Sequence, residues 1–208
     1  MGLLTQGFVQ LLQFLHSFTG NYGWAIVILT VFIQLALYPL TASQMKAAAD
    51  LKRINPKLKE IQEKYRDKPE ELQRRLMELY REHKVNPFGG CLPLLLQLPI
   101  LWALFAGLSN FPYRGTPAFL WVSDLGKPDP WILPILSGLT TYLQMSMGPL
   151  DPSQRAMVVV MPIFMAWITR RFAAGLALYW VVGNVVRMAQ QWWMNRRLER
   201  EEAERETR

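Results

Sequence analysis

The polar residues that could do chemistry in this chain lie inside long apolar stretches, at helical spacing. They are amides, hydroxyls and one guanidinium: Thr30, Gln34, Gln97, Thr141, Gln144, Asn184 and Arg187. Such groups exchange hydrogen bonds, and arginine adds a fixed positive charge, but none of them is a general acid or base near neutral pH. The stretches around them contain no Asp, Glu or His, which argues against an intramembrane protease. The chemistry expected is hydration and binding of a polar group, and no enzymatic activity.

Five apolar stretches are the elements that must position these side chains. They are Gly23–Leu40, Cys91–Leu108, Trp131–Met147, Ala156–Thr169 and Ala173–Trp193. A helix needs roughly 20 mostly apolar residues to cross about 30 Å of hydrocarbon, so the short fourth stretch is expected to use its polar flanks at the interface. The fold class predicted is all-α, a polytopic membrane protein with five transmembrane helices.

Charge is confined to two segments of the chain. Residues 44–86 and 196–208 contain 17 of the 23 Lys/Arg and 13 of the 16 Asp/Glu. The other 152 residues contain nine charges, too few to cover the surface of a soluble domain, so lipid is expected to cover it. A single cysteine, Cys91, excludes an internal disulfide and a multi-cysteine metal site, and no cofactor is expected.

The pattern predicts five consecutive regions. Residues 1–22 form an interfacial amphipathic helix, with Leu4, Phe8, Leu11, Leu12, Leu15 and Phe18 at helical spacing. Residues 23–43 form the first transmembrane helix, and residues 44–86 form a cytoplasmic helical hairpin with two narrow apolar seams. Residues 87–195 hold transmembrane helices two to five, with an outer loop at 111–130. Residues 196–208 form a cytoplasmic charged tail, interpreted as a solvated helical extension.

The distribution of basic residues predicts the orientation. With the N-terminus outside, the inner side carries 19 Lys/Arg and the outer side four, as the positive-inside rule requires. The polar positions of four helices then lie in the half of the bilayer that faces the cytoplasm. Two explanations stay open: hydrogen bonds between helices, worth about 0.6 kcal/mol each, or a wet cavity open to the cytoplasm.

Four sequence motifs carry a family resemblance. The run NPFGGCLPLLLQLPI at 86–100 closely resembles the signature of the second core span of the YidC/Oxa/Alb family of membrane protein insertases. Supporting matches are YPLT at 38–41, WVSDLGKPDPWILPIL at 121–136 and GLALYWVVGNVV at 175–186. Together they extend from about Tyr22 to Trp193, in the family's order. The chain resembles the short, five-span bacterial form.

The resemblance implies an insertase or chaperone of the bacterial cell membrane that uses no nucleotide, cofactor, metal or covalent chemistry. It implies a hydrophilic groove in the inner leaflet, which coincides with the polar positions above. The family's characteristic arginine is replaced here by Gln34, in the run VFIQLALYPL. Gln34, Gln97, Gln144 and Asn184 would still hydrate the groove, and Arg187 could partly restore its positive charge.

The resemblance also suggests partners, and rival functions remain beside it. A hydrophobic substrate segment is expected to slide along Tyr142, Met145 and Trp180. The expected partners are nascent membrane proteins and the lipid bilayer, with the basic hairpin as the better candidate for docking a ribosome or Sec translocon; no DNA or small-molecule substrate is expected. A small transporter or channel would need a polar path through both leaflets, which the apolar outer halves lack. A structural assembly factor stays open.

Overall fold

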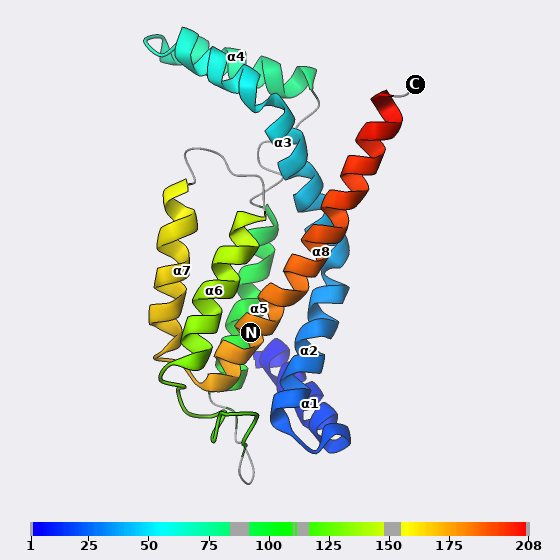
Figure 1. Ribbon diagram of the computed structural model, residues 1–208, viewed down its shortest axis with the longest axis vertical. Helices are drawn as coiled ribbons and strands as arrows, with labels where there is room; N and C mark the ends of the chain where they lie inside the picture. Colours follow the sequence, from blue (N-terminus) through cyan, green and yellow to red (C-terminus); the bar gives the residue numbers. More distant parts are fainter. Residues whose placement is uncertain (1, 84–91, 110, 112–116, 148–154, 207–208) are drawn as a thin grey trace. The chain divides into compact units, whose positions relative to one another are not determined.

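The computed structural model describes residues 2–83, 92–109, 111, 117–147 and 155–206, which are mostly helical (Figure 1). The α-helices in these residues are α1 (Gly2–Thr19), α2 (Tyr22–Ala36), α3 (Tyr38–Lys64), α4 (Pro69–Glu82), α5 (Leu92–Ser109), α6 (Ile132–Ser146), α7 (Arg155–Thr169) and α8 (Ala174–Glu206). This confirms the all-α prediction. Cys91 and the side chain of Gln97 lie outside the described part of the chain.

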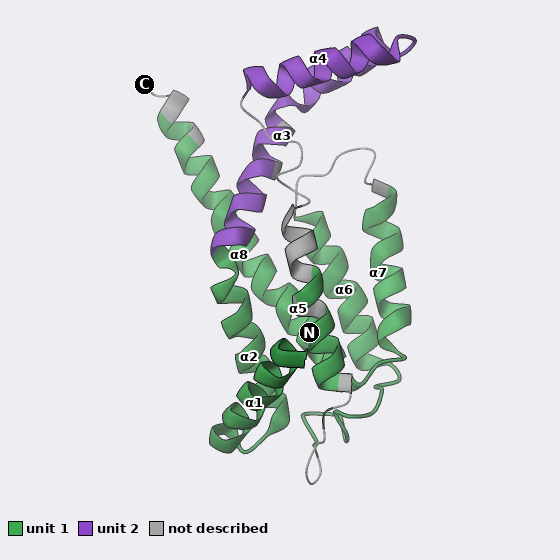
Figure 2. Ribbon diagram, turned by 180° about the vertical axis from the view of Figure 1, so that it is seen from behind, with its two compact units in different colours: residues 1–38, 97–208 green, residues 39–96 purple. Residues whose placement is uncertain are grey.

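The chain divides into two compact units. The first contains residues 1–38 and 97–208, and the second contains residues 39–96 (Figure 2). The second unit therefore extends beyond the predicted hairpin segment, 44–86, at both ends.

The first unit has an apolar core where α2 and α8 begin and α5 ends. Ile26 and Leu29 of α2 are almost fully buried in it, together with Leu104 and Leu108 of α5 and Ala177 of α8. Further contacts join α8 to α2 and α6, α6 to α7, and α1 to α2. The core thus fixes the positions of the helices that carry the predicted polar residues.

A tight corner joins α1 to α2. Gly20 ends α1 with a positive φ of 65°, a left-handed conformation that glycine adopts without strain. The Asn21 side chain then accepts hydrogen bonds from the backbone N–H groups of Gly23 and Trp24 and caps α2. The face of α1 that packs inward includes Phe8, Leu12 and Leu15, whereas the other predicted apolar residues, Leu4, Leu11 and Phe18, are exposed.

The first predicted transmembrane helix, residues 23–43, is interrupted. The structure ends α2 at Ala36 and begins α3 at Tyr38, after which α3 continues through Pro56 to Lys64. Pro39 explains the break: it has no N–H to donate to the preceding turn, and it disfavours helical geometry in the residue before it. It is tolerated in the first turn of α3, where N–H groups have no helical partner.

Among the described residues, a single helix that is both long and apolar enough to cross a membrane is not found. The pair Tyr22–Ala36 and Tyr38–Leu51 reaches that limit only together, with a bend between them, and Ala156–Thr169 is a shorter apolar helix.

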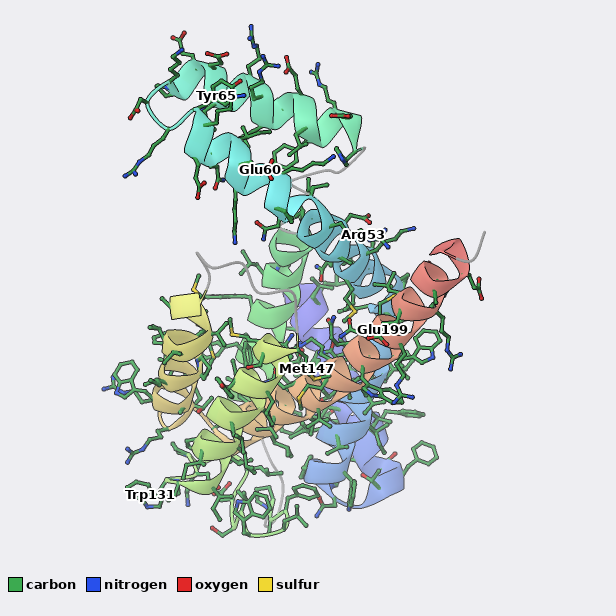
Figure 3. All side chains as sticks on the ribbon, turned by 45° about the horizontal axis from the view of Figure 1, so that its top comes forward. Arg53, Glu60, Tyr65, Trp131, Met147 and Glu199 are labelled. Carbon is green, nitrogen blue, oxygen red and sulfur yellow. The ribbon has the colours of Figure 1, made fainter. Side chains whose placement is uncertain are left out.

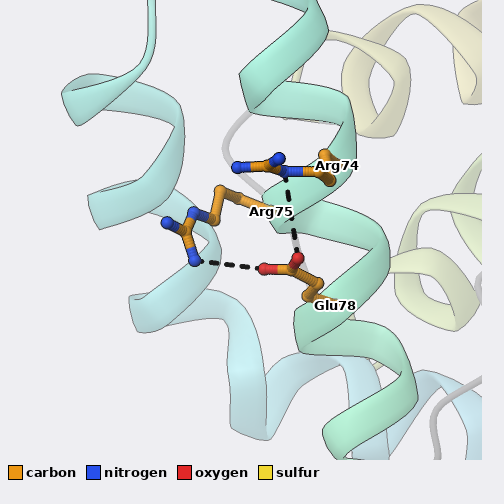
Figure 4. A network of polar contacts seen from close by, with 3 residues as sticks. All are labelled: Arg74, Arg75 and Glu78. Carbon is orange, nitrogen blue, oxygen red and sulfur yellow. Dashed lines mark hydrogen bonds and ion pairs between the residues drawn. The ribbon is translucent and has the colours of Figure 1, made fainter.

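In the second unit, α3 and α4 form a helical hairpin held by a thin apolar seam and by charge. Ile54 and Leu79, both predicted seam residues, are buried. On α4, Glu78 pairs with Arg75 at 3.1 Å and with Arg74 at 3.9 Å (Figure 4). The guanidinium of Arg75 also lies over the ring of Tyr65, 5.9 Å from its centroid, and so links α4 to the turn after α3.

The last helix does not end where the predicted last span ends. α8 continues from Ala174 to Glu206, so the predicted span and the charged tail form one helix. The segment after Trp193 contains no Gly or Pro, and Arg197 pairs with Glu201 one turn later at 3.1 Å. Nothing in the local sequence stops the helix.

The loop before α6 is ordered around Asp129. One carboxylate oxygen accepts hydrogen bonds from the backbone N–H groups of Trp131 and Ile132, at 2.8 and 3.0 Å. The other accepts from the indole N–H of Trp121 at 3.0 Å. Burial alone would raise the pKa of Asp129, but these hydrogen bonds to its charged form outweigh burial and lower it. Asp129 therefore caps α6 as a carboxylate.

Candidate functional site

The polar residues of the first unit gather toward one end of the helical bundle. Along α2, α6 and α8 alike, the residues buried in the apolar core come first, and the buried polar residues follow. These three helices run in the same direction, so their polar residues lie at the same end of the bundle (Figure 1). We call this set the polar cluster; its members are Thr30, Gln34, Thr140, Thr141, Asn184, Arg187 and Gln190.

Asn184 is the centre of the polar cluster. Its side chain is 1% exposed, and its amide N–H groups donate to the hydroxyls of Thr140, at 3.1 Å, and Thr141, at 2.9 Å. Its carbonyl oxygen accepts from the guanidinium of Arg187 at 2.6 Å. The indole of Trp180 also donates to the Thr141 hydroxyl, at 3.1 Å. One asparagine thus joins α8 to α6 and holds the arginine one turn further along α8.

Two hydrogen-bond donors meet beside Gly183. A Cβ atom added there would lie 3.1 Å from Nε2 of Gln34 and 3.8 Å from both terminal nitrogens of Arg187. Gln34 is 3% exposed, and its Nε2 has no hydrogen-bond partner among the described residues. Arg187 makes no ion pair within the same part of the chain. An amide and a guanidinium only donate through these nitrogens, so the place between them suits an acceptor such as a carboxylate.

The absence of a side chain at position 183 makes this convergence possible. Gly183 lies on α8 where Gln34 of α2 approaches, so α2 and α8 come close at this level.

A further contact ties the end of α2 to α8. The backbone carbonyl of Gln34 lies in the last turn of α2, where carbonyl groups lack a partner within their own helix. It accepts a hydrogen bond from the side-chain amide of Gln190 at 3.1 Å. The end of α2 at Ala36 leaves this carbonyl without a donor from its own helix, and the Gln190 side chain supplies one.

A separate hydrogen bond joins α6 and α7. Ser137 and Thr169 are both buried, and their hydroxyls lie 2.9 Å apart. Gly138 follows Ser137, and a Cβ there would lie 3.0 Å from both the Ala166 methyl and the Pro162 carbonyl. This pair serves helix packing and is not part of the polar cluster.

The structure brings together only some of the predicted residues. Thr30, Gln34, Thr141, Asn184 and Arg187 belong to the polar cluster. Thr30 is fully buried, and its hydroxyl donates to the carbonyl of Ile26 on its own helix at 2.6 Å. Gln144 is partly exposed, and the position of the Gln97 side chain is outside the described part.

The predicted slide residues differ in exposure. Tyr142 is exposed and Met145 is half-buried, whereas Trp180 is tied to Thr141 and belongs to the rim of the polar cluster.

Sequence reasoning missed Thr140, Gln190 and Gly183. The sequence pattern indicated Thr141 and Gln144 on α6 and left out Thr140, although Asn184 donates to both threonines. Gln190 lies three residues after Arg187, on the same face of α8, and this spacing was the signal available for it.

The hydrogen bonds from Asn184 to Thr140 and Thr141 correspond to the first explanation of the polar positions, which is hydrogen bonding between helices. Gln34 does not fit it, since its Nε2 has no acceptor among the described residues, and Arg187 has Asn184 as an acceptor but no anionic partner there. The polar cluster is therefore only partly satisfied within the part of the chain that the structure describes.

Comparisons with known proteins find relatives that match most of this chain. Residues 14–202 match the 60Kd inner membrane protein family. The membrane protein insertase YidC of Caldanaerobacter subterraneus subsp. tengcongensis is 45% identical over 184 residues, which cover 88% of this chain and 89% of that protein. The YidC of Geobacter sulfurreducens is 40% identical over 205 residues, 97% of this chain but 39% of that longer protein.

A solved structure is similar as well. A crystal structure of an active YidC insertase, with its first transmembrane domain resolved, superimposes with a TM-score of 0.71 at 30% identity, covering 89% of this chain and 44% of that one. These similarities favour an insertase over a small transporter or channel. The chain belongs to the 60Kd inner membrane protein family, the family of the YidC membrane protein insertases.

Proposed function

We propose that this chain inserts proteins into the bacterial cell membrane, receiving the polar end of a nascent membrane protein at the polar cluster and releasing its hydrophobic segment into lipid. The observation that carries the proposal is the convergence of Gln34 and Arg187 beside Gly183, where Nε2 of Gln34 has no acceptor among the described residues. Membership of the insertase family indicates the reaction, and the donor groups of Gln34 and Arg187 offer a binding place for the polar end of the substrate.

The exposed apolar faces support a location within the bilayer. On α2, large exposed residues recur one turn apart at Trp24, Ile28 and Phe32. On α7, most of the outward face is apolar, including Ile163, which is 65% exposed. In water such surfaces would cost free energy, whereas hydrocarbon covers them without cost. We therefore place the five predicted segments across the membrane, with the N-terminus outside and the C-terminus in the cytoplasm.

In this orientation the polar cluster lies in the cytoplasmic half of the bilayer. We propose that water and the polar tail of a substrate reach it from that side, while the apolar core closes the outer half. The tail then has to cross only half of the hydrocarbon without polar contacts.

Arg187 gives the site a preference for acidic tails. A carboxylate 4 Å from its guanidinium is attracted by about 4 kcal/mol at an effective dielectric constant near 20, before the carboxylate's own desolvation is deducted. The guanidinium is already partly buried in the folded chain, so substrate binding adds only part of its desolvation. Gln34 supplies a neutral donor next to it, where the family resemblance leads one to expect a second cation.

The hydrophobic segment supplies the driving force. Burial of apolar surface contributes about 25 cal/mol per Å², which over a 20-residue segment far exceeds the roughly 2.5–3.5 kcal/mol needed to bring one charge to the bilayer centre. We propose that the segment leaves along Tyr142, Met145 and Trp180, at the edge of the polar cluster. The basic α3–α4 hairpin is our candidate for contact with a ribosome or a Sec translocon.

The test is insertion into vesicles that contain the purified full chain. Two single-span substrates differ only in their N-terminal tails, one acidic and one neutral, and the protease-protected fraction measures insertion. Arg187→Gln is expected to slow insertion of the acidic substrate about tenfold, which corresponds to about 1.4 kcal/mol or a third of the attraction estimated above. Gln34→Arg is expected to speed it, and the neutral substrate should change little in both cases.

Arg196→Gln is the matched control, since Arg196 is exposed on the same helix and its guanidinium lies over Trp192 at 4.4 Å. Equal effects on both tails would show that Arg187 acts on the fold and not on the substrate's charge. If the unaltered chain inserts no more substrate than empty vesicles do, the proposed function itself fails.

A further inference from the structure

The loop before α6 and the turn between α7 and α8 form one exposed surface, apart from the polar cluster. We call it the aromatic rim; its residues are Leu120, Trp121, Trp131, Trp167, Arg170 and Arg171. Its continuity follows from contacts through Asp129, which accepts from the Trp121 indole and from the Trp131 backbone N–H. Arg170 lies over the Trp131 ring, 4.6 Å from its centroid. Figure 3 shows the Trp131 side chain at the edge of the molecule, pointing away from the ribbon.

The tip of the aromatic rim is a rigid turn that exposes an apolar side chain. Phe119 and Val122 exchange two backbone hydrogen bonds, of 2.8 and 2.9 Å, and both side chains are buried. Leu120 lies between them with a φ of 52° and is 73% exposed. A left-handed backbone normally selects glycine or asparagine, and here it carries a leucine whose side chain is mostly exposed. The side chain has a reason to be apolar only if something outside the chain covers it.

Two arginines of the aromatic rim indicate what covers Leu120. Arg171 lies over the Trp167 ring, 4.4 Å from its centroid, just as Arg170 lies over Trp131. Neither arginine pairs with a carboxylate in the described residues. A guanidinium stacked on an indole keeps the N–H groups at its edge free, and these bind phosphate oxygens well. Tryptophan and arginine together are typical of the boundary between hydrocarbon and headgroups.

The rim also lies where exposed apolar stripes end. On α6, the exposed residues Trp131, Ile135 and Leu139 follow one another a turn apart. On α7, Val160, Phe164 and Trp167 form a similar exposed stripe that ends next to Arg170. Both stripes therefore stop at the two arginines.

We propose that the aromatic rim binds the headgroup region of a phospholipid bilayer: Leu120 and Trp121 enter the boundary of the acyl chains, and Arg170 and Arg171 bind the headgroup phosphates. The rim thereby holds one end of the bundle at a fixed depth. This inference rests on the proposed location in the membrane but not on insertase activity.

Depth-dependent quenching tests the proposal. In a Cys91→Ser background, Ser123→Cys places an environment-sensitive fluorophore on the exposed residue after the turn, and Ile163→Cys places one on the exposed face of α7. The full chain is reconstituted in vesicles of phosphatidylcholine and phosphatidylglycerol that carry a nitroxide on the headgroup or in the acyl chain. The label at 123 should lose most emission to the headgroup nitroxide, and the label at 163 to the acyl-chain nitroxide.

Two sets of variants separate the contributions of the rim. Leu120→Asn keeps a residue that tolerates the left-handed turn but removes the apolar tip, and it should abolish headgroup quenching of the label at 123. Anionic phosphatidylglycerol should give more headgroup quenching of the label at 123 than pure phosphatidylcholine, because it attracts the two arginines. Arg170→Gln with Arg171→Gln should remove this difference. Arg196→Gln, also stacked on a tryptophan, should leave it unchanged.

Each other outcome overturns the proposal. If the label at 163 is quenched and the label at 123 is not, the rim does not touch the bilayer, although the membrane location stands. If neither is quenched, the rim proposal and the membrane location both fail. If neither nitroxide quenches the label at 123 although its emission reports an apolar environment, a second protein chain covers this surface. Quenching that Leu120→Asn leaves unchanged would show that the rim does not set the depth.

Discussion

The three hydrogen bonds of Asn184 predict that this side chain stabilises the bundle strongly, and Asn184→Leu tests it. Leucine has the same branched arrangement of side-chain heavy atoms, so the substitution removes the hydrogen bonds while it keeps the shape of the side chain, and its larger methyl groups push the former partners apart. It disconnects Thr140 and Thr141 on α6 and leaves the Arg187 guanidinium without its acceptor.

The magnitude follows from the partners. The two bonds to threonine hydroxyls are neutral bonds between helices, worth about 0.6 kcal/mol each in a membrane protein. The 2.6 Å bond from Arg187 involves a charge and is roughly twice as strong. The free energy of unfolding should therefore fall by about 2 kcal/mol. The Thr140 hydroxyl keeps its own acceptor, the Leu136 carbonyl at 2.7 Å, which limits the loss on α6.

The measurement is reversible unfolding in mixed micelles by a denaturing detergent, followed by circular dichroism. Gln191→Leu is the matched control, because Gln191 is also buried on α8 but its amide donates only to Asn195 on the same helix, at 2.9 Å. We expect this control to lose less than about 0.6 kcal/mol. A double-mutant cycle with Arg187→Gln should show a coupling near 1 kcal/mol. Equal losses for the two leucine variants, or strict additivity in the cycle, would refute the reasoning.

Two further predictions concern the loop before α6 and its contact with α2. Gly23→Ala should destabilise the protein by about 1–3 kcal/mol, because the new Cβ overlaps the buried ring of Phe119; the thermal midpoint in detergent measures this, and Gly7→Ala, whose Cβ meets nothing within 4 Å, should not lower it. Because hydrogen bonds lower the pKa of Asp129, its stabilisation of the start of α6 is complete above the ordinary carboxyl pKa of about 3.9 and is lost as pH falls through the lower folded-state pKa. Protection of the Trp131 and Ile132 amides from hydrogen exchange should fall in that range, and Asp129→Asn should remove the pH dependence; a pH-independent protection in the unaltered chain would contradict the assignment.

The sequence predicts the helical fold well because its signals are local. Apolar residues recur at helical spacing, charges fall in two blocks, and both patterns indicate helices without any knowledge of packing. The break before Pro39 was also a local signal, but the apolar run around it suggested one uninterrupted span. The charged tail was interpreted as a helical extension, and α8 runs through it without a break, since no residue after Trp193 stops a helix.

The site was predicted less completely because it depends on which helices meet. Helical spacing alone placed Asn184 and Arg187 on one face of α8 and Thr141 on α6. It could not show that Thr140 shares the amide of Asn184, since that depends on the rotation of α6 against α8. The bond from Gln190 to the Gln34 carbonyl could not be foreseen either, because that carbonyl becomes available only where α2 ends.

The uninterrupted course of α8 has a mechanical consequence. The 13 steps from Asn184 to Arg197 extend about 20 Å along a single helix, at a rise of 1.5 Å per residue. If α8 moved along its axis by one residue, the neighbour of Asn184 would lie at the level of the two threonines, and its side chain points about 100° away from them. A tilt of α8 about the level of Asn184 would keep the hydrogen bonds to the two threonines. A force on the charged end of α8 would therefore reach Arg187 as a tilt of the helix and not as a shift of the helix along its axis.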